Sequence, residues 1–178
     1  MLFRSRRYPA TDTSLPARYA RAIAAYRHGG VSNALAQIEA LIQAQPTNPY
    51  FHELKGQALV ATGENRHSDE AISLLRVAMQ REPEAPEVYS QLAMAYGRKG
   101  EVGEADLASA QAALARGDMK TARELAARAK TRFPTGSPGW VRSDDIVGLK
   151  QPRQSMFGST KFTIGPAQRG PAAAGPTQ

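Results

Sequence analysis

The stretch PEVYSQLAMAYGRKGEVGEADLASAQAALARG, residues 86–117, carries the clearest structural signal in this chain. It contains two alanine-rich segments of helical period that meet at Gly100. When residue 86 is taken as position 1, its apolar and small residues fall at positions 4, 7, 8, 11, 15, 20 and 27: Tyr89, Leu92, Ala93, Tyr96, Gly100, Ala105 and Ala112. Alanine and glycine at positions 8, 20 and 27 allow close approach of two helices, and the larger residues fill the space between them.

The same unit recurs along the chain. Four alanines, each shortly after a glycine, are separated by 37, 34 and 17 residues. They are Ala34, Ala71, Ala105 and Ala122. The interval of 37 requires three extra residues in the turn around residues 65–68. A 34-residue unit of helix, turn and helix is the period of the tetratricopeptide repeat (TPR), and the last interval is half of it. A generic four-helix bundle would not explain this recurrence with glycine and proline in register, so the sequence predicts an all-α, TPR-like right-handed helical solenoid.

The helical pattern predicts about seven helices, or three and a half repeats. Their expected ranges are 14–28, 31–45, 49–62, 68–81, 86–99, 102–115 and 118–132. Ser14, followed by Leu15 and Pro16, is the expected N-cap of the first helix. We expect residues 1–13 to be an N-terminal linker remnant, 14–133 the repeat domain, 134–147 a capping segment and 148–178 a disordered tail rich in proline and glycine. Trp140 is expected to cover the end of the last helix.

Composition narrows the classes of function. The chain of 178 residues has no cysteine, which excludes disulfide scaffolds and thiol chemistry. No apolar run is long enough to predict a transmembrane segment. The net charge of +7 comes from the two ends, because residues 51–134 carry twelve basic and twelve acidic residues. This distribution argues against specific nucleic-acid binding. It leaves open a nonspecific contact of the basic ends with acidic surfaces or RNA: Arg4, Arg6, Arg7, Lys150, Arg153, Lys161 and Arg169.

No active site is predicted. The pair His52-Glu53 begins an H-E-x-x-H pattern, but its fifth position is Gly56 instead of a second histidine. His28 and His67 lie in expected turns. The paired carboxylates Asp144 and Asp145 fall in the segment expected to be a solvated turn. We therefore assign no catalytic, metal-binding or cofactor-binding residue to this chain.

Binding of a protein or peptide is the better prediction. In a TPR array the first helix of each repeat lines a concave groove through positions 2, 5, 9, 12 and 13. These positions give the expected groove residues: Tyr19, Ile23, Tyr26, Arg27, Tyr50, Glu53, Gln57, Val60, Glu87, Ser90, Met94 and Arg98. The surface suits an extended or helical apolar segment and lacks a paired basic clamp for a C-terminal carboxylate. The alternative that Tyr19 and Ile23 only pack the repeats stays open, as does the oligomeric state.

Four longer strings carry a closer resemblance. They are RYPATDTSLPARYARAIAAYR, PYFHELKGQAL, LAMAYGRKGEVGEADLASAQAALARGD and FPTGSPGWVRSDDI. Over roughly residues 6–146 the chain resembles the C-terminal repeat region of bacterial zinc metallopeptidases of the β-barrel assembly-enhancing protease type. In that family an N-terminal domain carries H-E-x-x-H, and the resemblance implies that the repeats hold substrates or partners in outer-membrane assembly.

The catalytic domain and its zinc ligands are absent from this sequence. The resemblance therefore implies a non-catalytic arm, with zinc present only if a catalytic domain is supplied elsewhere. The alternative is that the chain is part of a zinc metalloendopeptidase for outer-membrane protein quality control. As written, without a signal peptide, the chain is expected in the cytoplasm, and as a fragment of such a protease it is expected in the periplasm.

Overall fold

The structure is a computed structural model that describes residue 9 and residues 11–149. This part of the chain contains eight α-helices, one short 3-10 helix and no strand. The helices are α1 (Leu15–Arg27), α2 (Val31–Ala44), α3 (Pro49–Ala61), α4 (Ser68–Arg81), α5 (Pro86–Lys99), α6 (Val102–Ala115), α7 (Met119–Lys130) and α8 (Pro138–Gly148). The 3-10 helix η1 (Asn65–His67) lies where the three extra residues were expected.

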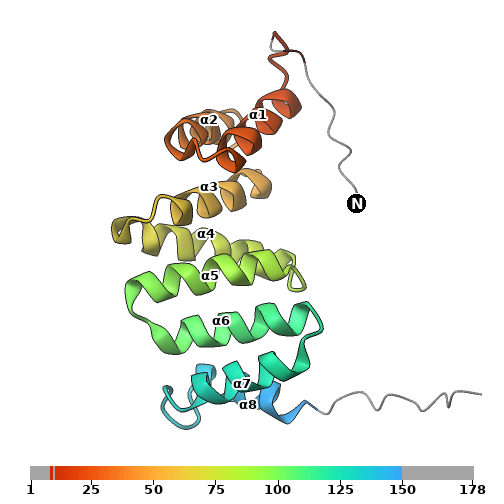
Figure 1. The fold of residues 1–178 in the computed structure, drawn as a ribbon. Helices are drawn as coiled ribbons and strands as arrows, with labels where there is room; N and C mark the ends of the chain where they lie inside the picture. Colours follow the sequence, from red (N-terminus) through yellow and green to blue (C-terminus); the bar gives the residue numbers. More distant parts are fainter. Residues whose placement is uncertain (1–8, 10, 150–178) are drawn as a thin grey trace, which may run out of the picture.

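The helices stack in chain order as an elongated array, with α1 and α2 at one end and α7 and α8 at the other (Figure 1). Each helix packs against the next one along the chain, and α6 also contacts α8. The predicted all-α, TPR-like solenoid is confirmed. The predicted helix boundaries agree with the observed ones within a few residues.

An eighth helix is the main departure from the prediction. Residues 134–147 were expected to form a cap without helical period, yet α8 begins at Pro138 behind an N-cap, because the Ser137 hydroxyl accepts a hydrogen bond from the Trp140 amide (3.3 Å). Asp144 and Asp145 therefore lie on a helix rather than in a solvated turn. The described chain thus contains four helix pairs instead of three and a half repeats.

A buried core runs through the array in three clusters. The first lies between α1, α2 and α3 around Ile38 and Leu41, and the second between α3, α4, α5 and α6 around Leu75 and Val88. The third joins α6, α7 and α8 around Leu107 and consists largely of alanines. Because alanine side chains are small, the helices at this end approach one another closely.

The helix ends follow the local chemistry of the sequence. Ser14 caps α1 as predicted, and its hydroxyl accepts from the Ala17 amide (3.4 Å). Gly100 ends α5 in the left-handed conformation with a φ of 81°, which a side chain would disfavour. The predicted linker and tail fall largely on residues 1–8, 10 and 150–178, which lie outside the described residues, as do the basic residues of both ends.

Candidate peptide-binding groove

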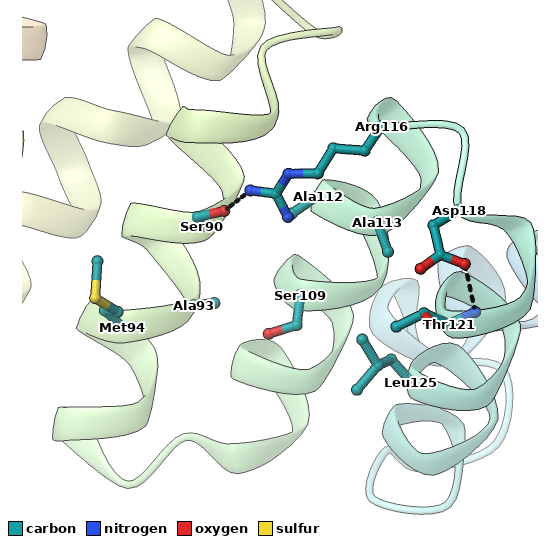
Figure 2. Close-up of a pocket in the computed structure, with 10 residues that line it drawn as sticks. All are labelled: Ser90, Ala93, Met94, Ser109, Ala112, Ala113, Arg116, Asp118, Thr121 and Leu125. Carbon is teal, nitrogen blue, oxygen red and sulfur yellow. Dashed lines mark hydrogen bonds between the residues drawn. The ribbon is translucent and has the colours of Figure 1, made fainter.

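A hollow of about 440 Å³ lies between α5, α6 and α7. We call it the α5–α7 hollow (Figure 2). Its lining residues are Ser90, Ala93, Met94, Ser109, Ala112, Ala113, Arg116, Asp118, Thr121 and Leu125. Met94 is 45% exposed although it is a large apolar residue. The hollow therefore offers an apolar, solvent-accessible surface within the stack of repeats.

The helical period of α6 explains why the hollow lies on one side of the molecule. Ser109, Ala112, Ala113 and Arg116 are spaced by three, four and seven residues, so they share one face of α6. Two other hollows border the opposite face of α6, which carries Glu104, Ala108 and Gln111, and both are also lined by Arg142 of α8. The α5–α7 hollow is thus separated from α8 by the body of α6.

Polar groups lie at the edge of the α5–α7 hollow near the α6–α7 turn. The Arg116 Nη2 donates a hydrogen bond to the Ser90 hydroxyl (2.7 Å), which links α5 to the end of α6 (Figure 2). Asp118 caps α7, and its Oδ1 accepts from the Thr121 amide (3.1 Å). Hydrogen bonds from Thr121 lower the pKa of the Asp118 carboxyl below its usual value, so this carboxylate is ionised and already engaged.

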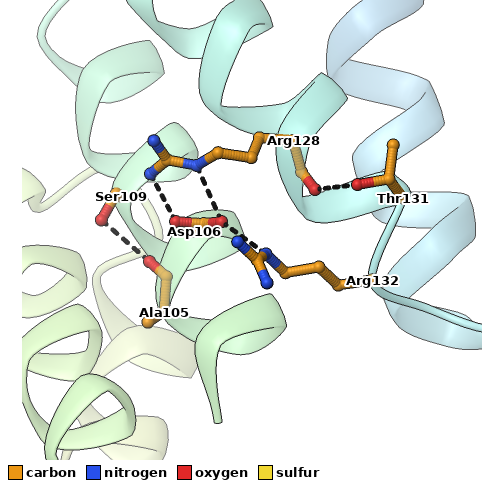
Figure 3. A network of polar contacts seen from close by, with 6 residues as sticks. All are labelled: Ala105, Asp106, Ser109, Arg128, Thr131 and Arg132. Atoms are coloured by element: carbon orange, nitrogen blue, oxygen red, sulfur yellow. Dashed lines mark hydrogen bonds and ion pairs between the residues drawn. The ribbon is translucent and has the colours of Figure 1, made fainter. Parts of the chain in front are cut away.

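An ion cluster joins α6 to α7 beside the α5–α7 hollow (Figure 3). Asp106, whose side chain is only 8% exposed, accepts two hydrogen bonds from Arg128, with Nε at 2.9 Å and Nη2 at 2.5 Å. It also accepts one from the Arg132 Nε at 3.2 Å. Hydrogen bonds to Asp106 raise the pKa of Arg128 above its ordinary value. A single buried carboxylate therefore fixes two guanidinium groups.

The expected groove residues of the third repeat are placed as follows. Ser90 and Met94 both line the α5–α7 hollow. Glu87 is exposed at the start of α5 and lies outside that lining. Arg98 is half-buried, and its Nη1 donates to the Val60 carbonyl, which ties α5 to α3. The structure thus brings together only two of these four residues.

The expected residues of the first repeat mainly support the core. Tyr19, Ile23 and Tyr26 are partly buried and pack against the cluster around Ile38. The ring of Tyr19 lies 5.4 Å from that of Phe51, centroid to centroid. Arg27 is exposed as the last residue of α1. Packing between repeats, the alternative left open for Tyr19 and Ile23, accounts for the contacts of these two side chains.

The second repeat gives a mixed result. Tyr50 is exposed at the start of α3, whereas Glu53 and Gln57 are half-buried and joined by a hydrogen bond of 2.9 Å. Burial, aided by the charge of Glu82, raises the pKa of the Glu53 carboxyl above its usual value. Val60 departs from the prediction, because its side chain is only 3% exposed and belongs to the core cluster around Leu75.

Sequence reasoning missed the contribution of α6 and α7. The mapping used only the first helix of three repeats, so the α6 residues and the fourth repeat were not considered. One full TPR period on from Pro86 places position 1 at Lys120. Positions 2, 9 and 13 are then Thr121, Arg128 and Arg132. The repeat period was therefore the signal that could have found these three residues.

The remaining sequence candidates have local roles. The His52 Nε2 is hydrogen-bonded to the Pro46 carbonyl oxygen (2.6 Å), and His28 and His67 lie at the ends of α1 and α4. Within residues 11–149 no three histidine, aspartate or glutamate residues form a group that could hold a metal ion. None of the described helices has both the length and the apolar character needed to cross a bilayer.

Comparison with protein families agrees with the helical repeats. Residues 19–86 match the tetratricopeptide repeat family, a range that ends at the first residue of α5. A thermophilic TPR protein of Thermus thermophilus is similar in structure, with 20% identity, a TM-score of 0.42, and coverage of 77% of this chain and 83% of that one. No curated protein matches this chain. The family match supports a TPR protein, and these findings carry no link to zinc metallopeptidases.

Proposed function

We propose that this chain is a non-catalytic module that binds a segment of a partner protein in the α5–α7 hollow. TPR arrays present one face of stacked helices to extended or helical segments, in which an apolar side chain is the usual anchor. The observation that supports the proposal is Met94, which lines the hollow from α5 and stays 45% exposed. Ala93, Ala112, Ala113 and Leu125 continue this lining across α5, α6 and α7. An exposed apolar side chain that lines a hollow is typical of a binding surface.

The experiment is a selection of random displayed peptides on the immobilised full chain, followed by affinity measurement with labelled synthetic peptides. Met94→Asp places a charge where an apolar side chain would be buried. We expect this variant to lower the affinity for the selected peptides at least about tenfold, since burying an unpaired charge costs more than about 1.4 kcal/mol.

Val77→Asp is the matched control. Val77 lies on α4, is 48% exposed and does not line the α5–α7 hollow. We expect this variant to bind the selected peptides as the unchanged chain does. Selected peptides that bind Met94→Asp as tightly as the unchanged chain would place the binding surface elsewhere.

We further propose that the module serves as the substrate-binding or partner-binding arm of a metallopeptidase-like protein, on the strength of the four strings that resemble that family. The alternative is that the chain is part of a zinc metalloendopeptidase whose catalytic domain lies outside it. A third alternative is that the chain is a freestanding adaptor. An immunoblot of source cells with an antibody against the repeats distinguishes this adaptor from the two protease-related proposals. A band well above 19.2 kDa favours the protease, and a band at 19.2 kDa favours the adaptor.

A further inference from the structure

The guanidinium groups of Arg128 and Arg132 have hydrogen-bonding capacity that the structure does not use. Arg128 donates to Asp106 through Nε and Nη2, and Arg132 donates to it through Nε alone. Among the described residues, the Arg128 Nη1 and both terminal nitrogens of Arg132 have no partner. Because the two side chains are 56% and 46% exposed, these donors are accessible from solvent.

The positive charge of this cluster is also not fully balanced. One aspartate faces two arginines, and Asp106 is the only carboxylate of residues 11–149 within ion-pair distance of either. Asp106 is nearly buried, and the hydrogen bonds that its carboxylate accepts come from these two arginines. The solvent-exposed face of the cluster is therefore positive. Fixed guanidinium groups with free donors are suited to a carboxylate, which accepts paired N–H bonds.

The ion cluster continues the α5–α7 hollow. Leu125, which lines the hollow, lies three residues before Arg128 on α7, so the two side chains share one face of that helix. On α6, Ser109 lines the hollow and lies three residues after Asp106 (Figure 3). Asp118, the carboxylate in the lining, is engaged as the N-cap of α7. An apolar surface therefore passes directly into a positive one.

We propose that Arg128 and Arg132 bind the acidic side chains of a partner segment whose neighbouring apolar side chain occupies the α5–α7 hollow. Asp106 is a positioning residue that holds both guanidinium groups in place. This inference rests on the proposed function and adds the chemistry of the partner: an apolar residue next to aspartate or glutamate. It also supplies the basic pair that the first three repeats lack.

A displayed peptide library with one fixed leucine tests the inference. The flanking positions vary among glutamate, glutamine, lysine and serine, and the selection is made on the full chain. We expect glutamate to be enriched over lysine about tenfold, as a charge-assisted hydrogen bond would give. Arg132→Gln should reduce this enrichment and leave Asp106 bonded to Arg128, so the fold is kept. Arg132→Glu should reverse the preference toward lysine.

Arg142→Glu is the control for nonspecific charge. Arg142 is exposed to nearly the same degree as Arg132, but it lies on α8 and lines the hollows on the other face of α6. The Arg142→Glu variant should leave the preference for glutamate unchanged. Recovery of peptides that depend on Met94 without enrichment of glutamate would overturn the acidic assignment and keep the groove. Failure to recover any Met94-dependent peptide would overturn the proposed function as well.

Discussion

Phe133 shows how single glycines shape the end of the array. Its ring lies between Gly103 of α6 and Gly139 of α8, and a Cβ built on Gly139 would lie 2.6 Å from the Phe133 Cε1. Such a separation is far below van der Waals contact, so a side chain at this position would force the Phe133 ring or α8 to shift. Gly139 also stands one full TPR period after Ala105, which itself stands one period after Ala71. The small-residue position of the repeat is therefore kept in α8.

We predict that Gly139→Ala destabilises the protein by about 1–3 kcal/mol through overpacking against Phe133. Thermal unfolding followed by circular dichroism measures the effect. Gly97→Ala is the matched control, because a Cβ at this exposed position on α5 has no atom within 4 Å. Alanine there should raise the stability slightly, since glycine is the poorer helix former. Equal melting temperatures for the two variants would refute the close contact.

Glu53 gives a prediction that depends on pH. Because burial raises the pKa of its carboxyl, the folded protein binds this proton more tightly than the unfolded chain does. Glu53 therefore adds stability at a pH below its unfolded pKa, and this contribution is lost as the pH rises through the raised value. Glu53→Gln should melt at a higher temperature than the unchanged chain at pH 7, and the difference should shrink toward pH 4.

The measurement is the melting temperature across that pH range, with Glu87→Gln as the control. Glu87 is exposed on α5, so removing its charge should have little effect at either pH. The amide oxygen of glutamine at position 53 can still accept the bond from Gln57. A variant that is less stable than the unchanged chain at pH 7 would show that the ionised carboxylate is favourable in its site.

At the scale of elements, α8 completes the solenoid. It packs against both α6 and α7, and Ile146 is buried in the cluster that contains Ala122, Ala126 and Ala129. Lys130 at the end of α7 joins the two helices, because its Nζ lies 2.6 Å from Asp144 and 4.3 Å from the centre of the Trp140 ring. Terminal repeats need such a covering helix to bury their apolar face.

We predict that a chain ended after residue 137 melts about 5–10 °C lower than the full chain, because loss of α8 uncovers the last core cluster. It should also bind a hydrophobic dye that the full chain excludes. A chain ended after Leu149 keeps α8 and is the control, for which we expect the melting temperature of the full chain. Equal stability of the two shortened chains would show that α8 does not support the fold.

The helices differ in how well the sequence predicts them. The first seven helices followed from helical period and from glycine and proline in register. The helix α8 was missed because residues 134–147 contain two prolines and two glycines, which are typical of a loop, and only four apolar residues. The full repeat period from Ala105 to Gly139 was present, but a glycine gives no hydrophobic signal.

For the whole molecule, the candidate site was predicted only in part. Ser90 and Met94 were found because the repeat positions used in the prediction line the α5–α7 hollow in the third repeat, although the same positions pack the core in the first. Val60 failed because its position faces the neighbouring helices, where the core cluster covers it. The contribution of Ser109 and Leu125 depends on how α6 and α7 pack, which a rule limited to the first helix of each of three repeats does not include.

The most direct measurement is a map of backbone amide shifts by nuclear magnetic resonance when a selected peptide is added to the labelled full chain. The peptide is one recovered by selection on the unchanged protein. We predict that the largest shifts belong to Ala93, Met94, Ala112, Ala113 and Leu125, around the α5–α7 hollow. Largest shifts at Gln111 and Arg142, which lie on the opposite side of α6, would contradict the account.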